Sequence, residues 1–229
     1  MKRLLFILTA MSLTIAGTVS SEPAPRQITV TGTGEIAAAP DMATITLGVT
    51  NEDVDAAVAM AATSNAVAAI LDRLEGMEIA GRDMQTQQFS IRPVWSNRSS
   101  DSNGTSKITG FQASNMVLVR IRDLAKLGGV LDAVIADGAN DFSGLQFSIQ
   151  NPDPLSEKAQ QAAVADATAS AKLLTSAAGV SLGMVLSITE QGGRGQPMMM
   201  ASARESGGAI AAGEVTINAS VTMVFQIEN

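Results

Sequence analysis

The C-terminal segment from Glu214 to Ile227 alternates apolar and polar side chains without a break. Its apolar positions are Val215, Ile217, Ala219, Val221, Met223, Phe225 and Ile227. A period of two over this length predicts a long β-strand with one buried face, so the fold must contain a sheet. The pattern leaves open whether this strand is central in its sheet or lies at an edge that pairs with a second copy.

Strand and helix patterns alternate along the rest of the chain. The strand patterns cover residues 27–36, 42–50, 84–95, 111–122, 144–150 and 184–190. Helical periodicity covers residues 53–75, 123–137 and 153–179. These segments make three strand-helix-strand units, which predict an α+β fold with mixed sheets and three main helices, with α/β as the alternative. Long helical crossovers permit parallel neighbours, and the first two strand patterns indicate a strand pair or one bent strand.

The ends of the expected helices carry capping signals. Gly76 is the expected C-terminal cap of the first helix, and Asp123 the expected N-terminal cap of the second. In the third helix Asp153 is the expected N-cap, with Pro154 at the first helical position. The apolar stripe of the first helix is Val67, Ile70, Leu71 and Leu74. That of the second is Leu124, Leu127, Leu131, Val134 and Ile135, before Asp137-Gly138 ends the helix.

The sequence GTGEIA at residues 32–37 matches the G-x-G-x-x-A fingerprint of dinucleotide-binding folds. That fingerprint requires a helix directly after it, because the helix N-terminus binds the pyrophosphate. Here Pro40 and more strand follow, so we expect no nucleotide site. Gly32 and Gly34 instead lie on the apolar face of their strand and let another element approach closely. The alanine-rich helix at 53–75 is the expected partner.

Two segments are expected to be long loops. Ser96 to Lys107 contains no apolar residue and is interpreted as an exposed hairpin loop. Gln191 to Gly213 is rich in glycine and small residues and is interpreted as a mobile loop. It contains Met198 to Met200, and methionine clusters can hold copper(I). Consecutive side chains on an extended segment point to opposite sides, which favours an adaptable contact surface over a metal site.

The N-terminus has the features of a secretory signal peptide. Lys2 and Arg3 precede an apolar run from Leu4 to Ile15, and small residues follow. The run is too short to span a bilayer, so residues 1–20 are interpreted as a cleaved leader and residues 21–229 as the mature domain, as one body or two α/β lobes. Without the two leader cations the net charge moves from −7 to −9. This acidity argues against nucleic acid as a partner.

Histidine and cysteine are absent from the chain. This excludes Ser-His-Asp triads, cysteine nucleophiles, disulfides and His/Cys zinc sites. Two carboxylate pairs, Asp137 with Asp141 and Asp153 with Glu157, remain as candidates for glycosidase-type acid/base chemistry. Asp137 adjoins a helix end, Asp141 is expected in a turn and Asp153 precedes a proline, so turn and cap roles are favoured. We therefore predict no enzyme and no catalytic, cofactor-binding or metal residue.

Five segments, taken in order, resemble the SIMPL-domain family of bacterial proteins. They are ITVTGTGEIAAAPDMATITLGV, GMEIAGRDMQTQQFSIRPVW, ITGFQASNMVLVRIRDLAKLGGVLDAVIADGANDFSGLQFSI, KAQQAAVADATASAKLLTSAAGVSLG and GEVTINASVTMVFQI. Trp95 stands where the family often has tyrosine. The resemblance implies an exported α+β protein, periplasmic or associated with the outer membrane, that forms large ring-like or channel-like oligomers. It also implies no established catalytic residues and suggests a role in envelope or oxidative stress.

These observations lead to three functional hypotheses. The first is a non-enzymatic, exported envelope protein that assembles into a homo-oligomer larger than a dimer. The second is a periplasmic module that binds a small ligand or a metal, and the third is a carboxylate hydrolase. For the first hypothesis, the contact or pore-facing elements are expected in the 96–107 and 191–213 segments.

Overall fold

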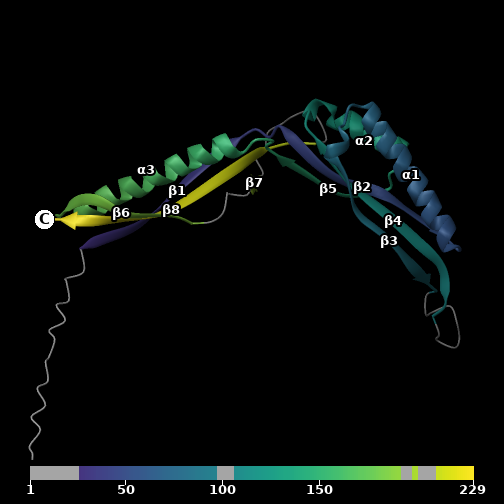
Figure 1. Cartoon of the computed structure of the whole chain (residues 1–229), viewed down its shortest axis with the longest axis horizontal. Coiled ribbons are helices and arrows are strands. Elements are labelled where there is room, and N and C mark those ends of the chain that lie inside the picture. Colours follow the sequence, from purple (N-terminus) through teal and green to yellow (C-terminus); the bar gives the residue numbers. More distant parts are fainter. Residues whose placement is uncertain (1–25, 97–105, 192–197, 201–209) are drawn as a thin grey trace, which may run out of the picture.

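The computed structural model describes residues 26–96, 106–191, 198–200 and 210–229. The expected signal peptide and most of the two expected loops lie outside these ranges. The described residues form two antiparallel sheets and three main helices (Figure 1). The α+β class, with its strand-helix-strand units, is therefore confirmed. The parallel pairing that the long crossovers would permit does not occur among the described strands.

The first sheet, here the terminal sheet, is built from the first described strand and from the strands that follow the third helix. Its strand order is β1 (Gln27–Ala38), β8 (Glu214–Glu228) and β6 (Ser181–Gln191), and β7 (Met198–Met200) also pairs with β8. β8 is thus central in its sheet, which settles the alternative that the sequence left open. Helix α3 (Asp153–Ala177) packs along one face of this sheet (Figure 1).

The second sheet, here the inserted sheet, is built from the chain between β1 and α3. Its strand order is β3 (Met84–Trp95), β4 (Ile108–Ile121), β2 (Met42–Asp53) and β5 (Asp141–Ser148). Helix α1 (Ala56–Gly76) connects β2 to β3, and α2 (Leu127–Ala136) connects β4 to β5. This β-α-β-β-α-β order leaves each pair of helix-connected strands separated by one antiparallel strand, which is the split arrangement of ferredoxin-like folds.

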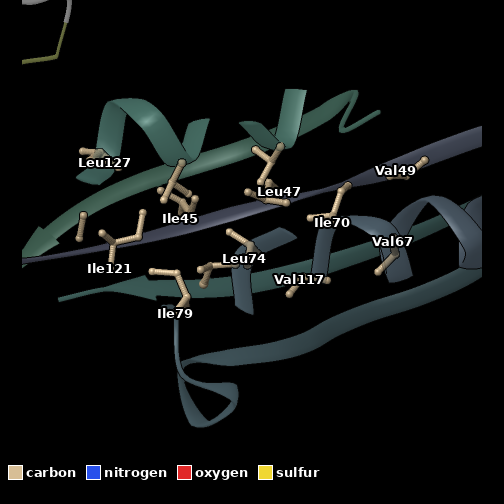
Figure 2. Close-up of a cluster of buried hydrophobic side chains, with 14 of the residues drawn as sticks. Ile45, Leu47, Val49, Val67, Ile70, Leu74, Ile79, Val117, Ile121 and Leu127 are labelled. Carbon is tan, nitrogen blue, oxygen red and sulfur yellow. The ribbon is translucent and has the colours of Figure 1, made fainter. Parts of the chain in front are cut away.

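Both helices of the inserted sheet cover the same face and enclose the larger hydrophobic cluster (Figure 2). Alternation on β2 points Ile45, Leu47 and Val49 into this cluster. The expected helical stripes supply the other side, with Val67, Ile70, Leu74, Leu127 and Val134 all buried. Val130, which the predicted stripe did not include, is buried as well. Ile135, which the sequence placed in the second stripe, is 63% exposed, because it lies one residue beyond the buried Val134 and faces outward.

Helix α1 has the length and hydropathy to cross a bilayer, the one helix of the described residues that does. Its buried side chains Ala59, Thr63, Val67, Ile70 and Leu74 recur at helical spacing. They pack onto β2 and β4, and Thr63 Oγ1 donates a hydrogen bond to the Ala113 carbonyl (3.3 Å). This packing identifies α1 as a core helix of the inserted sheet.

Gly32 and Gly34 do allow close packing against an alanine-rich helix, but that helix is α3. A Cβ on Gly32 would lie 2.2 Å from the Ala163 carbonyl oxygen, and one on Gly34 2.0 Å from that of Ala159. The sequence prediction of the 53–75 helix as partner is therefore wrong. Helix α3 presents small residues at every fourth position, whereas the buried face of α1 carries larger ones and fits a different sheet. The contact stripe of α3 is Ala159, Ala163, Ala167 and Ala171.

The GTGEIA match lies wholly within β1 and is not followed by a helix. Residues 39–41 then lead directly from β1 in the terminal sheet to β2 in the inserted sheet. The two segments are consequently not a strand pair, since β1 pairs with β8 and β2 with β4 and β5.

Three helix ends differ from the capping signals read in the sequence. The first helix ends through Met77 and Glu78, whose φ is 68°, rather than through a left-handed Gly76. The third begins with Asp153 inside the helix and Pro152 as N-cap, so Asp153 is not the cap. The second begins after a 3-10 turn, Leu124–Lys126, that leads directly into it: Asp123 caps this turn, where its side chain accepts a hydrogen bond from the Ala125 amide (3.1 Å), and Lys126 is the N-cap of α2 itself. Gly138 (φ 102°) follows the second helix as expected.

The two expected loops are partly ordered where the structure describes them. The Ser96 amide donates to the Lys107 carbonyl (2.8 Å), which closes the β3–β4 hairpin below residues 97–105. In the 191–213 segment, residues 198–200 form β7 and pair with residues 214–216 of β8. Asp141 opens β5 instead of lying in a turn, so this expectation is also wrong.

Polar groups join the two segments by which the chain enters and leaves the inserted sheet. The Gln150 amide donates a hydrogen bond to Asp41 Oδ1 (2.7 Å), and Gln150 Nε2 donates to the Arg122 carbonyl (3.1 Å). Beside it, Arg122 donates two hydrogen bonds to the buried carboxylate of Asp83 (2.8 and 2.7 Å). The hydrogen bonds from Arg122 lower the pKa of Asp83, against the opposing effect of desolvation.

We predict that Gly34→Ala lowers the free energy of unfolding by about 1–3 kcal/mol, because the new methyl group forces α3 away from β1. Chemical denaturation of the mature protein measures this. Gly144→Ala in β5 is the matched control, since a Cβ there meets nothing within 4 Å. Equal stability of the two variants would contradict the close packing of β1 and α3.

We also predict that Asp83→Asn destabilises the protein by about 1–3 kcal/mol at neutral pH, because it breaks the charged hydrogen bonds to Arg122. A depressed pKa in the folded state contributes stability above the unfolded value of about 4, and this is lost as pH falls through the folded value. The difference from wild type therefore shrinks below that pH. Denaturation curves across pH test this, with the exposed Asp132→Asn as control; a difference independent of pH contradicts it.

Candidate functional site

The carboxylates that the sequence offered as catalytic pairs have positions in the structure that favour other roles. Asp137 follows α2 and accepts two hydrogen bonds from Arg73 of α1 (2.7 and 3.3 Å). The hydrogen bond from Arg73 lowers the pKa of Asp137, so this carboxyl is ionised at neutral pH and is unsuited to act as a general acid. Asp153 opens α3, with Glu157 one turn later on the same helix. These geometries favour structural roles.

Within the described ranges, no group of three His, Cys, Asp or Glu side chains has the arrangement of a metal site. Met198 to Met200 are placed as backbone in β7, where they pair with β8. Their side chains lie outside the residues whose side chains the structure describes, so the predicted contact surface, favoured over copper(I) binding, stays a prediction.

The bare face of the inserted sheet, opposite the two helices, holds a candidate site. It is a hollow of about 810 Å³, a size typical of small-molecule sites. Its lining is polar and comes from all four strands and the residue before β5. It consists of Thr46, Thr50, Gln87, Gln88, Ser90, Arg92, Gln112, Ser114, Met116, Asn140, Asp141 and Ser143. We call this set the polar hollow.

Strand alternation explains why the lining is polar. On β2 the side chains of Ile45, Leu47 and Val49 enter the core, so Thr46 and Thr50 face the other side. Gly48 lies between them in the floor. A Cβ there would lie 2.5 Å from Met116 Sδ, so the glycine makes room for this buried methionine.

Hydrogen bonds hold one wall of the polar hollow in place. Asn140 pairs with the backbone of Thr50 in both directions: its Oδ1 accepts from the Thr50 amide, and its Nδ2 donates to the Thr50 carbonyl (both 2.8 Å). Thr50 Oγ1 donates to Ser114 Oγ on the next strand (3.1 Å). Asn140 thus continues the sheet at the point where β5 has not yet begun.

Other side chains of the polar hollow are free to meet a ligand. Within the described part of the chain, no hydrogen bond or ion pair engages the side chains of Gln88, Arg92, Gln112 or Asp141. Neutral amides both donate and accept hydrogen bonds, whereas Arg92 offers a cation and Asp141 an anion. The site is therefore suited to binding and carries no nucleophile paired with a base.

The sequence analysis did not find this site. The segments QTQQFS and FQASN are within the predicted strands 84–95 and 111–122, and nothing local shows that their polar side chains form one hollow. One feature of the sequence could have indicated the site: these segments carry amide and hydroxyl side chains, whereas exposed strands usually carry lysine and glutamate.

Exposed apolar side chains also gather on two of the four edge strands, β6 of the terminal sheet and β3 of the inserted sheet. On β6, Met184 and Ile188 are 66% and 56% exposed, and Val185 and Leu186 are exposed beside them. On β3 and β4, the exposed apolar residues are Phe89, Ile91, Trp95 and Ile108. β3 and β6 are each the outermost strand of their sheet, and they lead into the 97–105 and 192–197 segments.

Comparison with known proteins gives consistent matches over both sheets. Residues 28–225 match the family model described as "SIMPL: Protein of unknown function (DUF541)". The chain is 37% identical over 215 residues to the 26 kDa periplasmic immunogenic protein of Brucella melitensis, covering 89% of this chain and 86% of the relative. It is 30% identical over 176 residues to the uncharacterized protein YggE of Edwardsiella ictaluri (76% and 72% covered). Against YggE of Escherichia coli K12 the identity is 27% over 221 residues (93% and 88% covered).

Proposed function

Since this chain belongs to the SIMPL family, we propose that it is an exported envelope protein, not an enzyme, that assembles into a homo-oligomer larger than a dimer. The Brucella relatives are named periplasmic proteins, which supports export of this chain through its N-terminal segment. Association with the outer membrane, a ring-like or channel-like form and a role in envelope or oxidative stress rest on the family resemblance and belong to the same proposal.

The observation that carries the assembly proposal is the exposed apolar edge of β6. An outer strand has unpaired backbone groups along one side, and soluble proteins usually protect such edges with charges or prolines. From Met184 to Ile188, β6 carries neither. Large exposed apolar patches mark interaction sites. A second copy of the chain would cover the apolar side chains of this edge and form hydrogen bonds with its unpaired backbone groups.

The non-enzymatic part of the proposal rests on chemistry. Asp137 is held by Arg73, and the chain lacks the histidine and cysteine that most hydrolases use. The printed names of the relatives describe immunogenic or uncharacterized proteins.

A second function, the binding of a small polar ligand, is favoured by the polar hollow. Its volume, its anchored wall and its free amide and charged side chains are the features of a binding site. A metal ligand finds less support, because the described carboxylates of the hollow include Asp141 alone. Binding in the hollow and assembly through β6 use different surfaces, so the two functions are compatible.

We predict that the mature protein starts between Gly17 and Pro25 and is recovered from the periplasm. The charged start, the apolar run and the small residues that follow direct export and cleavage. Fractionation and N-terminal sequencing test this, and deletion of residues 2–20 is the control that should keep the protein in the cytoplasm. Full-length protein beginning at Met1 in the cytoplasm would contradict export.

We predict that Ile188→Lys weakens assembly roughly tenfold or more, because it places an unpaired charge in the contact surface. Light scattering and sedimentation of the mature protein give the mass. Thr189→Lys is the matched control, with the same charge on the same strand but on the opposite face.

Two results would contradict this proposal. A wild-type protein that stays monomeric at micromolar concentration removes assembly altogether. Equal masses for the Ile188→Lys variant and wild type remove β6 as the contact surface. Deletion of residues 197–209 separately tests the segment after β6, and an unchanged mass excludes that segment from the contact.

A further inference from the structure

We propose that the polar hollow binds a short, unblocked peptide in extended form, with Arg92 holding its carboxylate terminus and Asp141 its ammonium terminus. This inference rests on the second proposed function, ligand binding in the hollow, and names its ligand class. It is carried by the positions of the two charges and the neutral groups between them.

The registers of the strands place the lining in three rows across the bare face. One row is Gln88, Met116, Gly48 and Asp141; the next is Ser90, Ser114 and Thr50; the last is Arg92, Gln112 and Glu52. Arg92 is thus on one edge strand and Asp141 on the other, two rows apart. The charges lie at opposite corners, and neutral hydroxyl and amide groups lie between them.

Sheet dimensions give the length of the matching ligand. Three strand spacings across the sheet are about 14 Å, and two same-face steps along a strand are also about 14 Å, so the two Cα atoms lie roughly 20 Å apart. An extended peptide rises about 3.4 Å per residue. A peptide of about five residues therefore reaches from one charge to the other once the length of the arginine side chain is included.

The groups between the charges suit a peptide backbone. Gln88 and Gln112 each carry an unengaged amide that both donates and accepts, as a peptide bond does. Sugar rings commonly stack on aromatic side chains, and none of the described residues that line the hollow is aromatic. A highly charged ligand is also disfavoured, because the lining holds one cation and one anion.

Glu52 is the charged group closest to Arg92 in the rows. Gln112 lies between them, so Glu52 is two strand spacings away, about 10 Å, and does not occupy the guanidinium. Arg92 remains available to a carboxylate, which it can bind through two parallel hydrogen bonds.

The test uses the full mature protein and penta-alanine in isothermal titration calorimetry. We expect penta-alanine with free termini to bind, and its C-terminally amidated form to bind about tenfold more weakly. Arg92→Gln should weaken binding of the free peptide about tenfold but leave the amidated peptide unchanged. Asp141→Asn should weaken binding of the free peptide about tenfold but leave binding of the N-acetylated peptide unchanged. The control variants are Arg82→Gln and Asp132→Asn, exposed charges outside the hollow.

Each outcome is decisive. The proposal is supported if Arg92→Gln loses the preference for the free over the amidated peptide and Asp141→Asn loses the preference for the free over the acetylated peptide. Both control variants must keep both preferences. Equal affinity for free, amidated and acetylated peptides overturns the assignment of Arg92 and Asp141. Binding of maltopentaose without penta-alanine keeps the hollow as a ligand site but overturns the peptide class. If neither probe binds, ligand binding in the hollow is itself overturned, while assembly through β6 is unaffected.

Discussion

The backbone contact between β1 and α3 is the interaction on which the rest of the structure depends. With glycine at 32 and 34 and alanine along the facing stripe, strand and helix approach more closely than any larger side chain would permit. This contact, together with the pairing of β1 and β8, ties the first described strand to the last one. The inserted sheet, from residue 42 to residue 148, is therefore a continuous insertion in the chain between β1 and α3.

That insertion explains the placement of the polar hollow. The chain enters the inserted sheet at β2 and leaves it at β5, and both helical connections cross the same face. The opposite face is left without a cover, so its side chains are polar. At the entry and exit points, the hydrogen bonds from Gln150 to Asp41 fix the two crossing segments side by side.

The edge strands of the two sheets differ from the central strands in how well their apolar side chains are covered. β8 is paired on both sides and β4 lies inside its sheet, so the strands with the strongest apolar patterns are protected. The outer strands β3 and β6 carry apolar side chains that are exposed. A second copy of the chain is the partner we propose for this surface, and the polar face would remain free in that arrangement.

The sequence alone determined the local elements and much of their burial. Period-two alternation identified β3 and β8 closely, and helical periodicity identified Val67, Ile70 and Leu74 as core residues, because these signals arise from neighbours along the chain. It also established that Gly32 and Gly34 pack against an alanine-rich helix. The candidate site was not predicted, since Arg92 and Asp141 share a face only through the registers of four strands. Tertiary structure likewise decided which alanine-rich helix met the glycines. Both helices have small residues, but only α3 repeats them along its buried face, whereas larger side chains direct α1 to the inserted sheet.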